Sequence, residues 1–133
     1  MSMKIKATTP CYKFINASPE AQLEKIREEL EEVAEAWATY SADKTRANLL
    51  HLLMELTDVK ACVNTAMAQI HKAVEVENNE RCAKSATGEG EYTALLDFRN
   101  TMFYAKKAVI EKNLRRGYYT EAVSYTHLRA HET

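Results

Sequence analysis

The segment SPEAQLEKIREELEEVAEAWATY, from Ser18 to Tyr40, decides the fold class of this chain. Serine followed by proline and glutamate is a typical helix start, because serine caps free backbone N–H groups and proline fits the first helical position. Apolar residues then recur every three or four positions, which predicts an amphipathic helix over about 19–40. The residues expected to face inward are Leu23, Ile26, Leu30, Val33, Trp37 and Tyr40.

Two further helices are expected after a short polar break at 41–43, where Asp43 is placed to cap the next helix. The second runs from about Lys44 towards Asn78, and the third from about Glu91 to Arg116, where Gly117 suits its C-terminal cap. The expected inward residues of the second are Leu49, Leu52, Leu56, Val59, Val63, Met67, Ile70 and Val74. Those of the third are Leu95, Phe98, Met102, Ala105 and Val109.

Turn-forming residues are too sparse for a β fold. No glycine or proline occurs from Glu20 to Thr87, whereas a sandwich, a barrel or a βαβ fold needs such residues at every turn. The expected fold is therefore all-α: one domain over 18–121, an antiparallel bundle of three main helices. A protomer of three helices has apolar surface to spare, so we expect homo-oligomerisation to complete the bundle, most simply as a homodimer.

Composition narrows the class of partner. The 133 residues include 18 basic and 19 acidic side chains, and the net charge of −1 favours neither nucleic acid nor an anionic membrane as partner. No apolar run approaches the roughly 20 residues of a membrane span, and no signal peptide is evident, so a cytoplasmic protein is expected. Three cysteines without a CxxC pair are expected to be reduced and structural.

The two ends of the chain differ from the helical part. Residues 1–17 are expected to be an irregular segment with a short apolar cluster. The last eleven residues, 123–133, resemble the translation of a transposase-type sequencing adapter, so we expect 122–133 to be a non-native tail. His127 and His131 are then excluded as candidate ligands.

Acidic residues of the first two expected helices form two matching pairs. A helical wheel places Glu29 and Glu32 at the edge of the apolar stripe of the first helix, and Glu55 and Asp58 at the equivalent edge of the second. Both pairs stand 11 to 15 residues from Asp43, hence at a similar height above the turn of an antiparallel hairpin. The four carboxylates are therefore expected to converge.

Converging carboxylates repel one another unless something neutralises them. Lysine or arginine neighbours would give a structural network, for which Lys25, one turn before Glu29, is a candidate. Alternatively a hard divalent cation binds, and oxygen-only ligands suit Mg²⁺ or Mn²⁺ rather than zinc. A Mg²⁺ ion held by carboxylates usually completes its shell with water and substrate phosphates, so the second alternative indicates a phosphate-bearing small molecule.

The two acidic motifs resemble a known signature. Glu28-Glu29-Leu30-Glu31-Glu32 followed by Glu55-Leu56-Thr57-Asp58 is similar to the EExxE…ExxD pattern of the MazG-like all-α nucleoside triphosphate pyrophosphohydrolases, a superfamily that includes dimeric dUTPases. The resemblance covers about residues 18–117. It implies Mg²⁺-dependent hydrolysis of a nucleoside triphosphate to the monophosphate and pyrophosphate.

The resemblance also implies roles for individual residues. It makes Glu29, Glu32, Glu55 and Asp58 ligands of Mg²⁺, and Glu28 a catalytic base or water-orienting group, although the wheel places Glu28 outward. The residues expected to bind substrate are Lys25, Lys106, Asn113 and Arg116. The alternative is a non-catalytic helical interaction module whose carboxylates are neutralised by lysine and arginine.

Overall fold

The computed structural model describes residues 5–87 and 95–119, and these residues are all-α, as expected. A short 3-10 turn, η1 (Tyr12–Phe14), precedes three α-helices: α1 (Pro19–Ala42), α2 (Arg46–Thr87) and α3 (Phe98–Arg115). None of these helices is both long and apolar enough to cross a membrane. The chain divides into two units, residues 1–94 and 95–133, each of which is described by itself.

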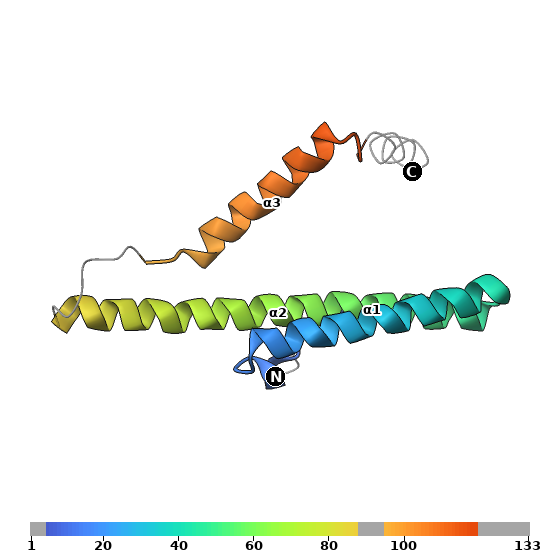
Figure 1. Cartoon of the computed structure of the whole chain (residues 1–133), viewed down its shortest axis with the longest axis horizontal. Coiled ribbons are helices and arrows are strands. Elements are labelled where there is room, and N and C mark those ends of the chain that lie inside the picture. The colour runs from blue at the N-terminus through green and yellow to red at the C-terminus, as the bar shows by residue number, and fades with distance from the viewer. Residues whose placement is uncertain (1–4, 88–94, 120–133) are drawn as a thin grey trace. The chain divides into compact units, whose positions relative to one another are not determined.

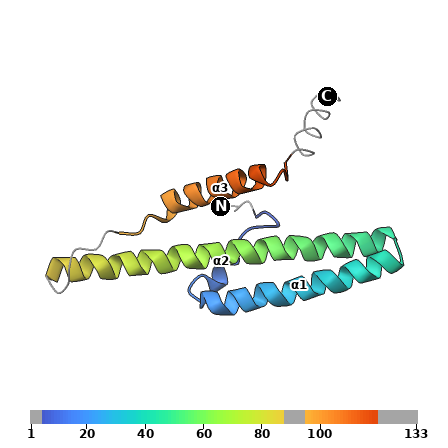
Figure 2. The same ribbon diagram turned by 45° about the horizontal axis from the view of Figure 1, so that its top comes forward.

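Helices α1 and α2 form an antiparallel hairpin, with α1 lying along one half of the longer α2 (Figures 1 and 2). At the turn, the backbone of Asp43 ends α1 by donating to Thr39, 3.0 Å away. The helix α2 is capped by Thr45, whose hydroxyl accepts from the N–H of Asn48 at 3.2 Å. The prediction that Asp43 caps the second helix was therefore wrong, because Thr45 stands one position before its start.

The face of α1 that contacts α2 includes three of the six residues predicted to face inward, namely Ile26, Val33 and Tyr40. Its buried and half-buried residues alternate by three and four positions, the spacing of a coiled-coil seam: Pro19, Gln22, Ile26, Glu29, Val33, Ala36 and Tyr40. Three residues predicted to face inward, Leu23, Leu30 and Trp37, are instead 56%, 52% and 57% exposed. At these three positions the preceding residues Gln22, Glu29 and Ala36 lie in the seam instead.

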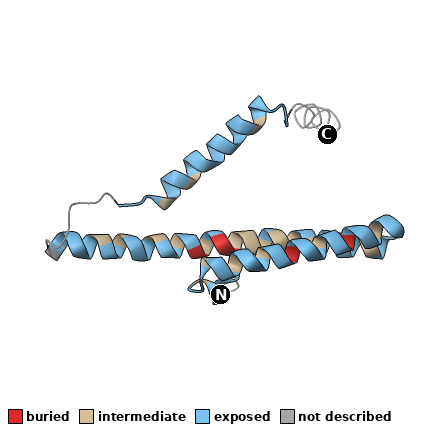
Figure 3. Cartoon of the chain, in the orientation of Figure 1, coloured by how far each residue is buried: buried red, intermediate tan, exposed pale blue. Residues whose placement is uncertain are grey.

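The seam of α2 shows the same departure. Of its predicted inward residues only Leu52 is buried, and the others are half-buried or exposed. The other buried residues of α2 are small or polar: Thr65, Ala66 and Gln69. Figure 3 shows how few positions of the described chain are buried. This small core favours the expectation that further apolar surface is covered by another copy.

Helix α2 is also longer than predicted, since it ends at Thr87 rather than near Asn78. Residues 79–87 contain no glycine or proline, and good helix formers such as Glu80, Arg81 and Lys84 dominate them. Arg81 also pairs with Glu77 one turn before it, at 3.1 Å.

The segment before α1 is attached to α2 by side-chain hydrogen bonds to its backbone. Asn64 donates to the carbonyl of Thr8 at 2.8 Å, and Gln69 donates to that of Phe14 at 2.9 Å. Between them, the N–H of Cys11 donates to the hydroxyl of Thr65 at 2.9 Å. Figure 2 shows this N-terminal segment beside α2. Residues 8–14 thus have a defined course although they are mostly irregular.

The second unit contains α3. Asp97 caps its first turn by accepting from the N–H of Asn100 at 3.0 Å, so the helix begins at Phe98 and not near residue 91 as predicted. Leu95, which was predicted to face inward from this helix, lies before it. Its end is as predicted: Gly117 has φ of 73° and donates to the carbonyl of Leu114 at 3.0 Å. Glycine tolerates this left-handed conformation because it has no Cβ.

Candidate metal centre

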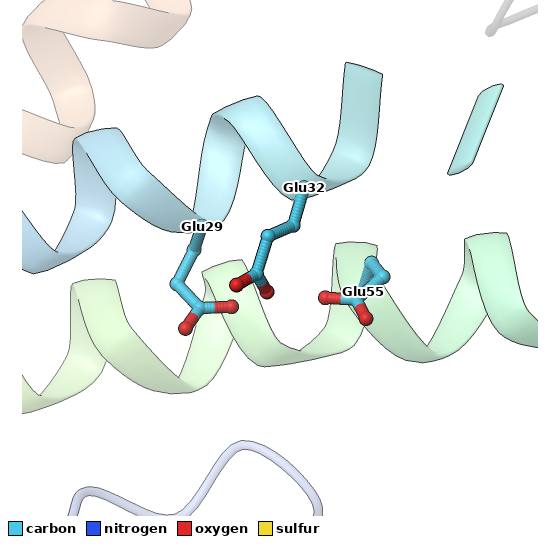
Figure 4. Close-up of side chains that lie close together, drawn as sticks. All are labelled: Glu29, Glu32 and Glu55. Atoms are coloured by element: carbon cyan, nitrogen blue, oxygen red, sulfur yellow. The ribbon is translucent and has the colours of Figure 1, made fainter. Parts of the chain in front are cut away.

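Three carboxylates from α1 and α2 lie close together across the hairpin. Each of Glu29, Glu32 and Glu55 offers a carboxylate oxygen, and these three atoms lie within 4.8 Å of one another. Figure 4 shows Glu29 and Glu32 reaching from α1 towards Glu55 on α2. Spacing of three residues along α1 puts the first two on one face, and the antiparallel turn brings Glu55 to the same level. We refer to these three residues as the carboxylate cluster.

Asp58, the fourth predicted ligand, is not part of this cluster. It is an exposed residue of α2, one helical turn beyond Glu55, and it lines a cavity together with Glu29. The two predicted pairs therefore reach the same level of the hairpin, but three carboxylates converge and Asp58 lies at their side.

The three residues of the carboxylate cluster are buried to different extents. Glu29 lies in the helix–helix seam and is 7% exposed, whereas Glu32 is exposed. The wheel had placed Glu29 at the edge of the apolar stripe. Because Glu29 rather than Leu30 takes the seam position, burial desolvates its carboxylate.

Few positive groups face these carboxylates. Lys25 Nζ lies 3.0 Å from Glu29 Oε1, and the pKa of Lys25 is raised by this hydrogen bond to Glu29. His51 Nε2 lies 3.8 Å from Glu55 Oε1, which is an ion pair only when the imidazole is protonated. The sequence left open that lysine and arginine side chains neutralise these carboxylates. At Glu29 one lysine, Lys25, does so.

Electrostatic repulsion remains within the cluster. The negative charge of Glu29 raises the pKa of Glu32, and a hydrogen bond with Glu55 acts in the same direction by favouring protonated Glu32. Among the described residues, Glu55 Oε2 is buried and finds no hydrogen-bond partner. A buried carboxylate oxygen without a donor is costly, so a cation bound at this oxygen would be favoured.

These features fit a hard divalent cation. All the ligand atoms are carboxylate oxygens, which suit Mg²⁺ and Mn²⁺, and the unpartnered oxygen of Glu55 belongs to the same cluster. A cation there would lower the repulsion that raises the pKa of Glu32.

A cavity of about 290 Å³ opens beside the cluster, between α1, α2 and the N-terminal segment. Its charged lining residues are Lys25, Glu29 and Asp58. The remaining lining residues are uncharged: Thr9, Cys11, Phe14, Gln22, Ala61, Cys62 and Thr65. Burial raises the pKa of the Cys62 thiol, and the charge of Glu29 adds to this effect, so Cys62 is a neutral thiol at physiological pH.

The other predicted site residues lie elsewhere. Glu28 is exposed on α1 and outside the carboxylate cluster, in agreement with the wheel. Lys106, Asn113 and Arg116 belong to the second unit. There, Asn113 donates to the hydroxyl of Tyr119 at 3.1 Å, and the guanidinium of Arg116 lies over the ring of Tyr118 at 5.8 Å. Their action on a substrate of the carboxylate cluster stays a prediction.

The N-terminal segment is the part of the site that sequence reasoning missed. Thr9, Cys11 and Phe14 line the cavity, although residues 1–17 were assigned no function. One sequence signal was present: a cluster of cysteine and aromatic residues at 11–15 with no helix of its own must find a hydrophobic partner. Nothing local indicates that the partner is α2.

No family model matches the chain, and no curated protein or solved structure matches it significantly.

Proposed function

We propose that this chain is a MazG-like, Mg²⁺-dependent nucleoside triphosphate pyrophosphohydrolase, which converts an NTP or dNTP to the monophosphate and pyrophosphate. The observation that carries the proposal is the carboxylate cluster of Glu29, Glu32 and Glu55, in which Lys25 pairs with Glu29 and Glu29 also lines a cavity. The resemblance of both acidic motifs to that family's signature supports the same activity.

In this function Glu29, Glu32 and Glu55 hold the cation, and Asp58 completes its surroundings from the adjoining turn of α2. Bound Mg²⁺ supplies Lewis-acid polarisation of the phosphate oxygens and charge neutralisation. Glu55 contributes its Oε2 oxygen, which has no competing hydrogen-bond partner in the part of the chain that the structure describes. Lys25 holds Glu29 in place through their ion pair and offers a positive charge at the cavity wall.

The remaining roles follow from the resemblance. The resemblance makes Glu28 the group that orients or deprotonates the attacking water. Lys106, Asn113 and Arg116 of the second unit bind the phosphate groups. We place the protein in the cytoplasm, where nucleoside triphosphates are available and the cysteines at 11, 62 and 82 stay reduced.

We also propose that the protein works as a homodimer. Within the described residues only Ala36, Leu52 and Ala66 are buried apolar residues, a small core for helices of this length. Leu30 and Trp37, one heptad apart on α1, remain exposed and form a stripe that a second copy would cover.

A second candidate function is a non-catalytic helical interaction module. The ion pair of Lys25 with buried Glu29 favours it, because such a pair neutralises an acid without a metal. The exposed apolar side chains of α1 would then bind a partner protein.

The deciding experiment incubates the purified full chain with a panel of ribo- and deoxynucleoside triphosphates and Mg²⁺, and measures monophosphate and pyrophosphate. Turnover of at least one nucleotide, lost on chelation of the metal, supports the hydrolase. No turnover with any nucleotide, together with a melting temperature unchanged by Mg²⁺ or Mn²⁺, overturns it in favour of the interaction module.

A further inference from the structure

The cavity beside the carboxylate cluster has two chemically different ends. Lys25, Glu29 and Asp58 supply every charge in its lining. The other described lining residues are uncharged, and Phe14 is the aromatic residue among them; the ammonium of Lys13, which is outside the lining, lies 5.6 Å from the centroid of the Phe14 ring. Such a lining matches a ligand that is ionic at one end and neutral, flat and partly apolar at the other.

We propose that this cavity holds the nucleoside part of the substrate, with the ring of Phe14 as the surface against which the base stacks. The inference rests on the proposed function and deepens it, because it assigns the nucleoside end to the N-terminal segment. The phosphates then lie towards Glu29, and the base lies towards Phe14 and Thr65.

The length of the cavity agrees with this orientation. Asp58 and Thr65, both in its lining, are seven residues apart on α2. At the rise of an α-helix these two turns span about 10 Å. A nucleoside extends over a comparable length from its 5′ oxygen to the far edge of its base. The volume of about 290 Å³ is at the small end for ligand pockets, as expected of a subsite that holds part of a ligand.

The aromatic wall is held in position by the fold. The carbonyl of Phe14 accepts from Gln69, a residue that is 2% exposed, and the N–H of Cys11 donates to Thr65. The 3-10 turn Tyr12–Phe14 therefore has both ends tied to α2. The segment is therefore ordered before a ligand binds, so binding does not include the entropic cost of ordering it.

Polar groups at the neutral end are already engaged. The hydroxyl of Thr65 donates to the carbonyl of Ala61 at 2.9 Å and accepts from Cys11, and the amide of Gln22 donates to the carbonyl of Cys62 at 3.0 Å. Stacking and shape are then the main contributions to binding of the base. Removal of the Phe14 ring should consequently have a large effect.

The cysteines of the chain provide a direct test. Cys11 lines the cavity and is exposed, whereas Cys82 is exposed on α2 and does not line it. The full chain with Mg²⁺ is alkylated with iodoacetamide, and the rate at each cysteine is measured by mass spectrometry. The α,β-methylene analogues of ATP, GTP, CTP and UTP serve as non-hydrolysable probes, and inorganic triphosphate as the probe without a nucleoside.

At least one analogue should slow alkylation of Cys11 by about tenfold and leave Cys82 unchanged. Inorganic triphosphate should protect neither cysteine, because it lacks the nucleoside. Equal rates at Cys11 with and without saturating analogue, or equal protection by inorganic triphosphate, would overturn the proposal.

A matched pair of variants tests the role of the ring. Phe14→Ala should raise the KM of the nucleotide by about tenfold, the effect expected for loss of one stacking contact, and leave kcat within twofold. Tyr12→Ala is the control, because Tyr12 lies in the same turn but not in the cavity lining. Phe14→Leu, which keeps an apolar side chain without the ring, covers the case in which the alanine variant does not fold.

The two proposals fail in different ways. Turnover by the native chain with an unchanged KM in the Phe14 variants would overturn the nucleoside pocket and leave the hydrolase intact. Absence of turnover in the native chain would overturn the hydrolase, and protection of Cys11 by the analogues would then decide the pocket separately.

Discussion

Lys25 and Glu29 stand one helical turn apart and form an ion pair of 3.0 Å, in which the lysine side chain is 52% exposed and that of Glu29 is 9% exposed. The pair thus joins a solvated cation to a carboxylate inside the helix–helix seam. Its position matters because Glu29 is also the deepest member of the carboxylate cluster. The carboxylate of Glu29 thus serves both the metal-free fold and the proposed metal centre.

Replacement of Lys25 should therefore destabilise the metal-free protein. Lys25→Met leaves the buried carboxylate of Glu29 without its partner, and we expect a loss of about 1–2 kcal/mol in the free energy of unfolding, reduced from a fully buried pair because the lysine is half exposed. Urea denaturation with and without MgCl₂ measures this. Saturating Mg²⁺ should restore part of the loss, and an equal loss under both conditions would contradict a shared role for Glu29.

Binding of the cation should stabilise the native fold. A ligand at one hundred times its Kd adds about 2.7 kcal/mol to the free energy of unfolding, so Mg²⁺ or Mn²⁺ should raise the Tm and EDTA should reverse the change. The triple variant Glu29→Gln, Glu32→Gln, Glu55→Gln should show no such rise. An equal rise in the triple variant would place metal binding elsewhere.

Loss of the Glu55 carboxylate should abolish turnover without unfolding the chain. Glu55→Gln is expected to lower kcat/KM by at least about a hundredfold, because replacement of even a supporting residue at a metal site commonly costs ten- to a hundredfold. Glu31→Gln is the matched control, an exposed acid of α1 outside the cluster. A variant at Glu55 that retained native turnover would show the ligand assignment to be wrong.

In the metal-free protein, the raised pKa of Glu32 makes the free energy of unfolding depend on pH. Because its pKa is higher in the fold than its ordinary 4.5, the folded state binds more protons than the unfolded state, and stability is lost as pH rises from 4.5 through the folded value. Glu32→Gln removes this penalty.

The variant should therefore melt above the native protein at pH 7 and close to it at pH 4, in thermal scans with EDTA. A higher Tm of the native protein at pH 7 would contradict the repulsion inferred among the three carboxylates.

Substitution on the exposed stripe of α1 should change the oligomeric state. Leu30→Lys puts a charge at the centre of the stripe and should convert the proposed homodimer to a monomer in size-exclusion chromatography with light scattering. Glu35→Lys, an exposed position on another face of α1, should leave the dimer intact. A monomeric native chain at micromolar concentration would contradict the proposed dimer.

Helix positions were well predicted where the signal is local. The start of α1 at Pro19 and the left-handed glycine after α3 follow from residues that act on their immediate neighbours. The predictions failed at the end of α2, which lies at Thr87 rather than near Asn78, and at the start of α3, which lies at Phe98 rather than near Glu91.

Part of the site was also predictable from local signals in the sequence. Counting residues from the turn places Glu29, Glu32 and Glu55 at one level, since the hairpin and the helical rise determine that level without further information. The separation of Asp58 from the cluster was not predictable, because it depends on the rotation of each helix about its own axis.

Local periodicity, capping residues and the short turn were sufficient to determine an all-α chain and the height of its acidic pairs along the hairpin. Tertiary packing decided which residues of α1 are buried, because Leu30 and Glu29 lie on adjoining faces and only the contact with α2 leaves Leu30 exposed and Glu29 buried. It also decided that the N-terminal segment forms a cavity wall. Hydrogen bonds between groups more than fifty residues apart, such as Thr65 with Cys11, hold it there, and they leave no pattern in the neighbouring sequence.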